Sequence, residues 1–298
     1  MTAVGTAQLK LGAVILTMGD RPAELKALLD SVAAQDGDPI EVVVVGNGAS
    51  PGDLPEGVRC LELPENLGIP GGRNAGIEAF GPGGRDVDVL LFLDDDGVLP
   101  DKGTAELVRA AFEADPGLGI ISFRIADPET GTTQRRHVPR LRASDPLRSS
   151  RVTTFLGGAN AVRTQVFQQV GGLPEQFFYA HEETDLAWRA LDAGWSIDYR
   201  ADMVLHHPAT APSRHTMFHR MVARNRVWLA RRNLPLPLIP VYLSVWLLLT
   251  LVRRPSRAGL KAWFGGFAEG WRTSCGPRKP MRWRTVWRLT RLGRPPVI

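Results

Sequence analysis

Three consecutive acids, Asp94-Asp95-Asp96, directly follow an apolar stretch at residues 87–93. Adjacent carboxylates repel one another unless a cationic group neutralises them. In an extended chain Asp94 and Asp96 point to one side and Asp95 to the other, so Asp94 and Asp96 can face one divalent cation. Oxygen ligands of this kind suit Mg²⁺ or Mn²⁺ that is shared with phosphate groups. The alternative interpretation is a solvated turn that caps a helix.

A second acid cluster, Glu182, Glu183 and Asp185, lies at the start of a predicted helix over 182–193. The helix macrodipole favours acids in the first turn, which would explain the cluster without any function. Asp185 can pair with Arg189 one turn later, so we interpret Asp185 as structural. Glu183 or Glu182 remains a candidate general base, because a carboxylate with an ordinary pKa is ionised at pH 7 and can accept a hydroxyl proton.

Two histidines, His206 and His207, follow a predicted strand over residues 196–205. A single histidine is more often a packed or surface residue than a metal ligand. A histidine at the end of a strand, in a chain that also holds an acid triplet, is nevertheless a candidate ligand.

A glycine-rich stretch surrounds Arg73 and Asn74. We predict a short helix over 71–80 after a glycine-rich loop, and the four glycines at 68, 71, 72 and 76 also suggest a flexible loop around Arg73 and Asn74. The guanidinium of Arg73 could contact a diphosphate through two parallel hydrogen bonds, or it could lie on the surface.

Strands and helices alternate through the first half of the sequence, which predicts an α/β fold with a parallel sheet. Such sheets bind ligands at the carboxyl ends of their strands, where three polar clusters (17–20, 46–50 and 94–96) are expected. Strands are predicted over 11–17, 41–45, 58–63, 87–93 and 119–123, and further helices from residue 22 to 32, over 103–114 and near 162–170.

Length and composition allow one large α/β domain plus an appendage. The chain has 298 residues, of which 44% are hydrophobic, so it can build a sizeable core. Two cysteines, Cys60 and Cys275, are too few for a disulfide framework and fit a reducing compartment. The first residues lack the basic and apolar segments of a signal peptide, so we expect none.

The net charge of +5 is divided unevenly along the chain. Residues 253–298 carry twelve Lys and Arg against one acid, Glu269, whereas the preceding residues carry 24 basic and 30 acidic side chains. Six of the eight tryptophans also lie at or beyond residue 228. Basic residues interleaved with tryptophan suit an anionic membrane surface or a nucleic acid.

The segment 234–252 contains no charged residue, but prolines interrupt its beginning. Its uninterrupted apolar part spans twelve residues, whereas a membrane-spanning helix needs about 20. Arginines flank it on both sides, which places both ends in the cytoplasm by the positive-inside rule. We predict a segment that lies in the inner leaflet; the alternative is a buried core helix or a dimer helix.

Taken in order, these motifs resemble those of family 2 glycosyltransferases of the GT-A fold, over about residues 11–208. Gly46 departs from the family pattern, which has an acid there, and Glu183 stands where the family usually has the catalytic Asp. The matching residues are Thr17 to Arg21, Val45-Gly46-Asn47-Gly48-Ala49, Asn66 with Gly68, Arg73, Asn74 and Gly76, Asp94 with Asp96, Gly171 to Arg189, and His206.

The resemblance implies an inverting transfer of a sugar from a nucleotide-sugar donor to an acceptor hydroxyl, with Mg²⁺ or Mn²⁺ as cofactor. It is closest to rhamnosyl- and galactofuranosyl-transferase-like members, which implies a lipid-linked or polysaccharide acceptor in cell-envelope synthesis. The implied roles are general base for Glu183 or Glu182, metal ligation for Asp94, Asp96 and His206, and donor binding for Thr17, Arg21, Asn47, Arg73, Asn74, Asp94 and Asp95.

We therefore expect a GT-A domain over 1–212, with a donor half over about 1–125 and an acceptor half over about 150–212. A basic, Trp-rich helical region over 213–298 is expected to hold the enzyme on the cytoplasmic face of an anionic membrane. No nucleic-acid partner is expected, and a homo-oligomer is left open.

Two other readings of the sequence compete with this one. A sugar nucleotidyltransferase would need a Gly-rich loop with Arg and Lys after the first strand, where the chain has Thr17-Met18-Gly19-Asp20. A non-catalytic protein that binds membrane or nucleic acid through its tail would need neither the acid triplet nor Glu183.

Overall fold

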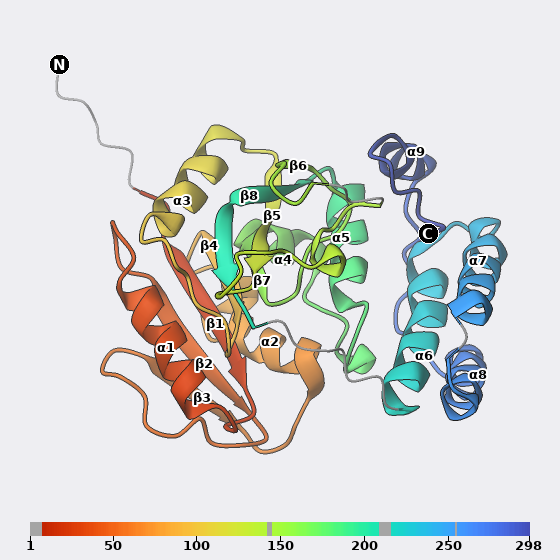
Figure 1. Cartoon of the computed structure of the whole chain (residues 1–298). Helices are drawn as coiled ribbons and strands as arrows, with labels where there is room; N and C mark the ends of the chain where they lie inside the picture. The colour runs from red at the N-terminus through yellow and green to blue at the C-terminus, as the bar shows by residue number, and fades with distance from the viewer. Residues whose placement is uncertain (1–7, 142–144, 209–215, 254) are drawn as a thin grey trace.

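The computed structural model describes residues 8–141, 145–208, 216–253 and 255–298. An α/β domain is followed by a group of C-terminal helices that stand beside it (Figure 1). The strands are β1 (Leu11–Thr17), β2 (Glu41–Asn47), β3 (Arg59–Leu63), β4 (Val89–Asp94), β5 (Leu118–Ala126), β6 (Ser150–Arg151), β7 (Ala159–Arg163) and β8 (Ser196–His206). The α-helices are α1 (Pro22–Ala33), α2 (Gly68–Glu78), α3 (Thr104–Ala114), α4 (Thr164–Val170), α5 (Glu182–Ala193), α6 (Thr216–Asn233), α7 (Leu238–Arg253), α8 (Arg257–Arg272) and α9 (Trp283–Arg291).

All eight strands form one sheet in the order β3-β2-β1-β4-β7-β5-β8-β6. The strands from β3 to β4 are parallel, and so are β5 and β8, whereas β7 runs antiparallel between β4 and β5 and β6 pairs antiparallel with β8. The predicted α/β fold with a mostly parallel central sheet and C-terminal helices is confirmed.

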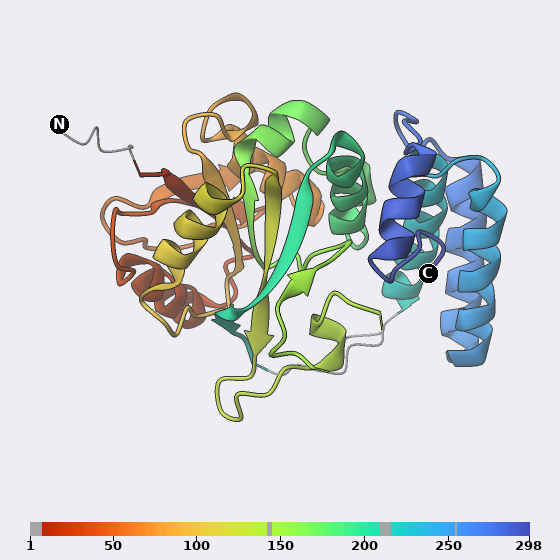
Figure 2. The ribbon, with the colours of Figure 1, turned by 90° about the horizontal axis from the view of Figure 1, so that it is seen from above.

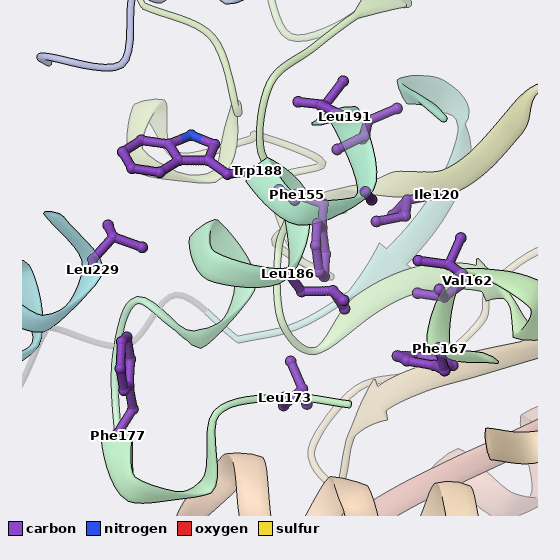
Figure 3. Close-up of a cluster of buried hydrophobic side chains, with 14 of the residues drawn as sticks. Ile120, Phe155, Val162, Phe167, Leu173, Phe177, Leu186, Trp188, Leu191 and Leu229 are labelled. Atoms are coloured by element: carbon purple, nitrogen blue, oxygen red, sulfur yellow. The ribbon is translucent and has the colours of Figure 1, made fainter. Parts of the chain in front are cut away.

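Two apolar cores cover the two faces of the sheet. Side chains from α1 and α3 pack on one face. Those from α2, α4 and α5 pack on the other, and this second core continues into α6, α7 and α9. Figure 3 shows part of it, with Leu186, Trp188 and Leu191 of α5 between the sheet residues Ile120 and Val162 and Leu229 of α6. One face of the sheet and the C-terminal helices therefore share a core through α5.

The predicted short helix over 71–80 corresponds to α2, whereas the predicted flexible loop around Arg73 was wrong, because the glycines lie within this helix. A Cβ atom on Gly72 would overlap the side chain of Leu16, and one on Gly76 would overlap Val14, both on β1. The glycines thus let α2 lie directly against the sheet and bury Arg73 at its edge. The helix predicted near 162–170 begins only at Thr164, because Val162 belongs to β7.

The C-terminal helices pack mainly through α6 against α8, with α7 beside them (Figure 2). Within the described residues, no helix combines the length and the apolar character needed to cross a bilayer. The predicted boundary between residues 212 and 213 lies outside the described residues.

Candidate active site

A pocket of about 480 Å³ opens at the carboxyl ends of β1, β2 and β4, beside the start of α2. Six of the seven predicted donor-binding residues line it: Thr17, Arg21, Asn47, Arg73, Asp94 and Asp95. Its other wall consists largely of apolar and aromatic side chains that the sequence did not indicate, namely Phe178, Tyr179, Phe218 and Met221. An apolar wall opposite charged groups is the usual composition of a small-molecule site.

The acid triplet contacts Thr17 and Arg21, and Arg21 lies near two of the acids, since its guanidinium is also 3.5 Å from Asp95. The Thr17 hydroxyl donates to Asp95 at 2.7 Å, and burial raises the pKa of Asp95. The guanidinium of Arg21 lies 2.5 Å from Asp96. The expectation that Asp94 and Asp96 share one direction assumed an extended chain, but the backbone turns after Asp94, whose carbonyl accepts from the amide of Gly97 at 2.9 Å.

His207, rather than the predicted His206, is the histidine beside the acid triplet. Nε2 of His207 lies 3.0 Å from Asp96, and this hydrogen bond raises the pKa of His207. Burial opposes ionisation of Asp96, but the hydrogen bond and charge of His207, with Arg21, lower its pKa. The backbone of His206 instead pairs with Val98, which fixes the end of β8 against the turn after the acids.

Arg73 lies between the acid triplet and the candidate base. Its side chain is 8% exposed, with one nitrogen 3.4 Å from Asp94 and another 3.6 Å from Glu183. Burial raises the pKa of Glu183, and the charge of Arg73 acts in the opposite direction. Arg73 thus brings Asp94, a predicted donor-binding residue, and Glu183, a predicted base, to one point at the pocket edge.

A glycine pair, Gly157-Gly158, makes this arrangement possible, and the sequence analysis missed it. A Cβ on Gly157 would overlap the carboxylate of Glu183, and one on Gly158 would overlap Asp94. The Gly158 carbonyl also accepts from the amide of Asp94 at 3.0 Å. Two adjacent glycines before β7 were the available signal that backbone passes close to functional groups there.

Glu182 and Glu183 differ in their surroundings. Glu182 is 1% exposed and its buried Oε2 has no hydrogen-bond partner within the described structure. Burial, followed by the charge of Glu183, raises the pKa of Glu182 well above its ordinary value. The preceding residues Phe178, Ala180 and His181 all have positive φ, a strained conformation that is concentrated at functional sites. Glu183 is the carboxylate that reaches Arg73, so it is the better placed candidate base.

Asp185 has the structural position that the sequence indicated. It is fully buried and accepts from Arg189 at 2.7 Å, from Arg232 at 2.9 Å and from Asn233 at 2.7 Å. Burial opposes its ionisation, but the charges of the two arginines lower its pKa. The carboxylate therefore fixes the end of α6 on α5.

Asn74 does not line the pocket, which removes the geometric support for its predicted role in donor binding. Its amide donates to the Leu173 carbonyl and to Glu175, both at 2.9 Å, and accepts from the Leu173 amide at 2.8 Å. Asn47 lines the pocket and also holds the turn before α2, because it donates to Asn66 at 2.9 Å.

The residues at the pocket fit a divalent cation only together with other ligands. No three His, Cys, Asp or Glu side chains in the described part of the chain converge so as to hold a metal ion. Asp94 nevertheless supplies hard oxygen atoms, because its side chain is 43% exposed at the pocket, whereas Asp96 pairs with Arg21 and His207 and does not line the pocket. Mg²⁺ commonly uses one or two carboxylates and completes its shell with water and substrate phosphates. The donor set thus suits a cation that binds together with a phosphorylated ligand.

The strand order and the pocket define an α/β fold of the GT-A type, as comparison with solved structures shows. S. aureus TarS 1–349 with UDP-GlcNAc aligns with a TM-score of 0.60 at 14% identity, covering 88% of this chain and 80% of TarS. The mannosyltransferase PcManGT from Pyrobaculum calidifontis, with GDP-Man and Mn²⁺, aligns at 0.57 and 18% identity, covering 90% and 77%. GalNAc-T7 with UDP, GalNAc and Mn²⁺ aligns at 0.60 and 13% identity, covering 80% and 50%.

The sequence model of the family described as glycosyl transferase family 2 matches residues 13–171, more than half of the chain. The chain therefore belongs to glycosyl transferase family 2. A curated relative, the pre-mycofactocin glycosyltransferase of Mycobacterium tuberculosis, is 26% identical over 234 residues, which cover 74% of this chain. The chain spans 44% of the length of that relative.

Proposed function

We propose that the protein transfers a sugar from a nucleotide-sugar donor to an acceptor hydroxyl in one inverting displacement. The observation that carries this proposal is the position of Arg73, within 3.6 Å of both Asp94 and Glu183. The guanidinium of Arg73 can bind a phosphate group, and it lies beside Glu183, a carboxylate that can accept the proton of a hydroxyl. A single displacement needs no covalent nucleophile, so a phosphate-binding arginine and a general base are the kinds of group that the reaction requires.

In this mechanism the donor occupies the pocket lined by Thr17, Asn47 and Arg73. The guanidiniums of Arg21 and Arg73 exchange part of their contact with carboxylates for contact with the diphosphate. A bound Mg²⁺ or Mn²⁺ would be held by Asp94, with water and the donor phosphates as its other ligands, and would stabilise the charge on the departing diphosphate.

Glu183 accepts the proton of the acceptor hydroxyl as that oxygen bonds to the anomeric carbon. The bond from this carbon to the diphosphate oxygen breaks at the same time, and the nucleoside diphosphate leaves. The pocket contributes by holding the two reactants in line.

Release of nucleoside diphosphate tests the proposal. The full chain is incubated with a panel of UDP-, GDP- and dTDP-sugars and Mn²⁺. Free nucleoside diphosphate is measured with and without candidate acceptors. We expect turnover with at least one donor, loss of turnover with EDTA, and loss in Glu183→Gln. Pyrophosphate-releasing synthesis of a nucleotide sugar would instead indicate a nucleotidyltransferase, and binding without any turnover would indicate a non-catalytic protein.

We also propose that the acceptor is a glycan or lipid-linked saccharide at the cytoplasmic face of a membrane. One supporting feature is an apolar exposed stripe on α7, whose opposite face packs in the core through Ile239, Tyr242 and Leu243. A helix that is apolar on both faces favours a further apolar partner. The exposed residues of the stripe are Val241, Leu248, Leu251 and Val252.

The outward side of α8 suits the surface of an anionic bilayer. It exposes Arg257 and Lys261 near its start and Phe264 and Trp271 further along. Basic and aromatic side chains of this kind bind the headgroup region. A second copy of the chain would bring these cations together unfavourably across a twofold axis, so we favour lipid as the partner.

A further inference from the structure

A second, smaller cavity lies on the side of α5 that faces α6, α7 and the last residues of the chain. Its volume is about 50 Å³. Since about 10–15 Å³ in this measure holds one water, the cavity matches a few waters or one phosphate-sized group. Its polar lining includes Thr154, His181, Thr184, Arg226, Trp246 and Arg294.

The cavity holds two arginines, Arg226 and Arg294, and no acid within the described residues forms an ion pair with either of them. The Arg226 side chain donates to the Tyr242 hydroxyl at 3.3 Å and lies 3.3 Å from the ring centroid of Trp246. Burial lowers the pKa of Arg226, and repulsion from neighbouring arginines adds to it. Burial, with the charges of Arg226 and Arg294, also holds the pKa of His181 well below its ordinary value. Uncompensated charge in such a place is costly.

Two buried nitrogen atoms at the same cavity have no hydrogen-bond partner within the described structure. They are Nε2 of His181 and Nε1 of Trp246, and the indole nitrogen can only donate. An unsatisfied buried donor costs free energy and calls for an explanation. His181 is moreover held at φ +74°, a conformation that is unfavourable for a residue with a side chain. A strained backbone, an unpaired indole donor, an unpaired histidine nitrogen and two arginines without an acidic partner thus coincide at one cavity.

These groups are complementary to a tetrahedral oxyanion. Guanidinium groups bind phosphate oxygens through paired hydrogen bonds, and the indole and threonine groups supply neutral donors. No Asp or Glu side chain lines the cavity within the described residues. We propose that this cavity binds a phosphate group.

The position of the cavity connects it to the acceptor side of the reaction. His181 and Thr184 flank Glu183 in the first turn of α5, and Trp246 belongs to α7, the helix with the exposed apolar stripe. Assigning the phosphate to an acceptor rests on the proposed function, whereas phosphate binding itself does not. A phosphate borne by a lipid and a free phosphate have the same chemistry here, and the experiment separates them.

Calorimetric titration of the full chain tests the proposal with two probes, inorganic phosphate and n-hexyl phosphate, at constant ionic strength. The variant Arg294→Gln removes a cation from the cavity, and Arg291→Gln removes an exposed one from α9 as the matched control. We expect the wild type and the control to bind alike and Arg294→Gln to bind at least about tenfold more weakly. Tighter binding of hexyl phosphate than of phosphate assigns the site to a lipid phosphate, and equal binding assigns it to a free one.

Equal affinity of the wild type and Arg294→Gln for both probes, or no binding at millimolar concentration, overturns the proposal. Circular dichroism first establishes that Arg294→Gln is folded. If it is not, Arg226→Lys serves instead, because it keeps the charge and loses the paired hydrogen bonds. Diphosphate release by the wild type is measured in parallel. A protein that turns over donor but binds no phosphate refutes this inference alone, and one that binds phosphate but turns over no donor refutes only the proposed function.

Discussion

The donor pocket and the C-terminal helices both hold many charged side chains, but these side chains bond to different kinds of partner. At the pocket, carboxylates pair with cationic side chains, as Asp96 does with Arg21 and His207. In the C-terminal helices, arginines often donate to backbone carbonyls: Arg231 to Thr273 at 2.8 Å and Arg288 to Leu191 at 3.1 Å are examples. Side-chain pairs can be exchanged for a charged ligand, whereas bonds to carbonyls hold the chain together. Arginine side chains are therefore available to bind a ligand at the donor pocket, whereas in the C-terminal helices they hold segments of the chain together.

Helix α5 belongs to both regions. Glu183 in its first turn lies beside Arg73, which lines the pocket, while Asp185 and Asp192 face the C-terminal helices. Asp185 contacts Arg232 of α6, and Asp192 accepts from the hydroxyl of Thr285 in α9 at 2.5 Å. The C-terminal helices therefore help to position the candidate base.

Asp94→Ala gives the largest expected loss and tests the pocket side of the comparison. Removal of the carboxylate deprives the donor site of its exposed oxygen ligand, so we expect a fall in kcat/KM of about a thousandfold, from the several kcal/mol that a cation contributes. The steady-state rate of nucleoside diphosphate release, with and without Mn²⁺, measures this fall in kcat/KM. Asp202→Ala is the control, because Asp202 lies within β8, does not line the pocket and pairs with Arg200 alone among the described residues. Activity near the wild type, with unchanged Mn²⁺ dependence, contradicts the assignment.

Glu183→Gln preserves size and removes basicity. We expect kcat to fall about a hundredfold or more with donor affinity unchanged, since general bases contribute 10²–10⁴. A matching loss in Glu182→Gln alone transfers the role to Glu182. In the wild type, kcat/KM should fall on acidification at a pH above the usual glutamate range of about 4.3, because burial raises the pKa of Glu183 and the protonated form cannot accept a proton.

Asp185→Asn tests the joint between the two regions. Breaking a buried charge pair leaves Arg232 without its carboxylate, so the free energy of unfolding should fall by about 3 kcal/mol. Asp202→Asn breaks an exposed pair and should cost about 1 kcal/mol or less. Urea unfolding monitored by circular dichroism compares them. An equal, small loss in both variants shows that Asp185 does not join the regions.

The stability that Asp185 contributes should depend on pH in a direction that its lowered pKa determines. The pKa of Asp185 is lower in the folded chain than the ordinary value of about 3.9. Its contribution is therefore complete above that ordinary value and is lost as the pH falls through the lowered one. The difference in stability between the wild type and Asp185→Asn should shrink only in strong acid.

The sheet was predictable because its central strands are apolar runs buried on both faces, as in residues 89–93 of β4. Strand β7 was missed because it has five residues with Asn160 at its second position, and it leads directly into α4. The direction of that strand depends on its neighbours β4 and β5, which local pattern does not reveal.

The candidate site was predictable in its residue types but not in its pairings. The acids and Arg73 stand out by composition and spacing, yet the choice of His207 over His206 depends on a backbone bridge between His206 and Val98. The basic tail shows the same limit, because sequence reveals a cation but not whether it contacts a carbonyl, as Arg231 does, or solvent.

The smallest expected effect concerns the outward side of α8. If the C-terminal helices bind an anionic membrane, Arg257→Gln with Lys261→Gln removes about 2 kcal/mol of attraction, which is about a thirtyfold weaker partition into vesicles. Lys10→Gln with Lys26→Gln removes equal charge from the α/β domain and should leave partition unchanged. Flotation with vesicles of phosphatidylglycerol and phosphatidylcholine at low salt measures the partition of both double variants.

Leu248→Ser should weaken binding to the same vesicles independently of salt, because Leu248 contributes apolar area rather than charge. An intact protein that stays at the bottom of the gradient and sediments as a compact dimer assigns the stripe on α7 to a second copy of the chain instead.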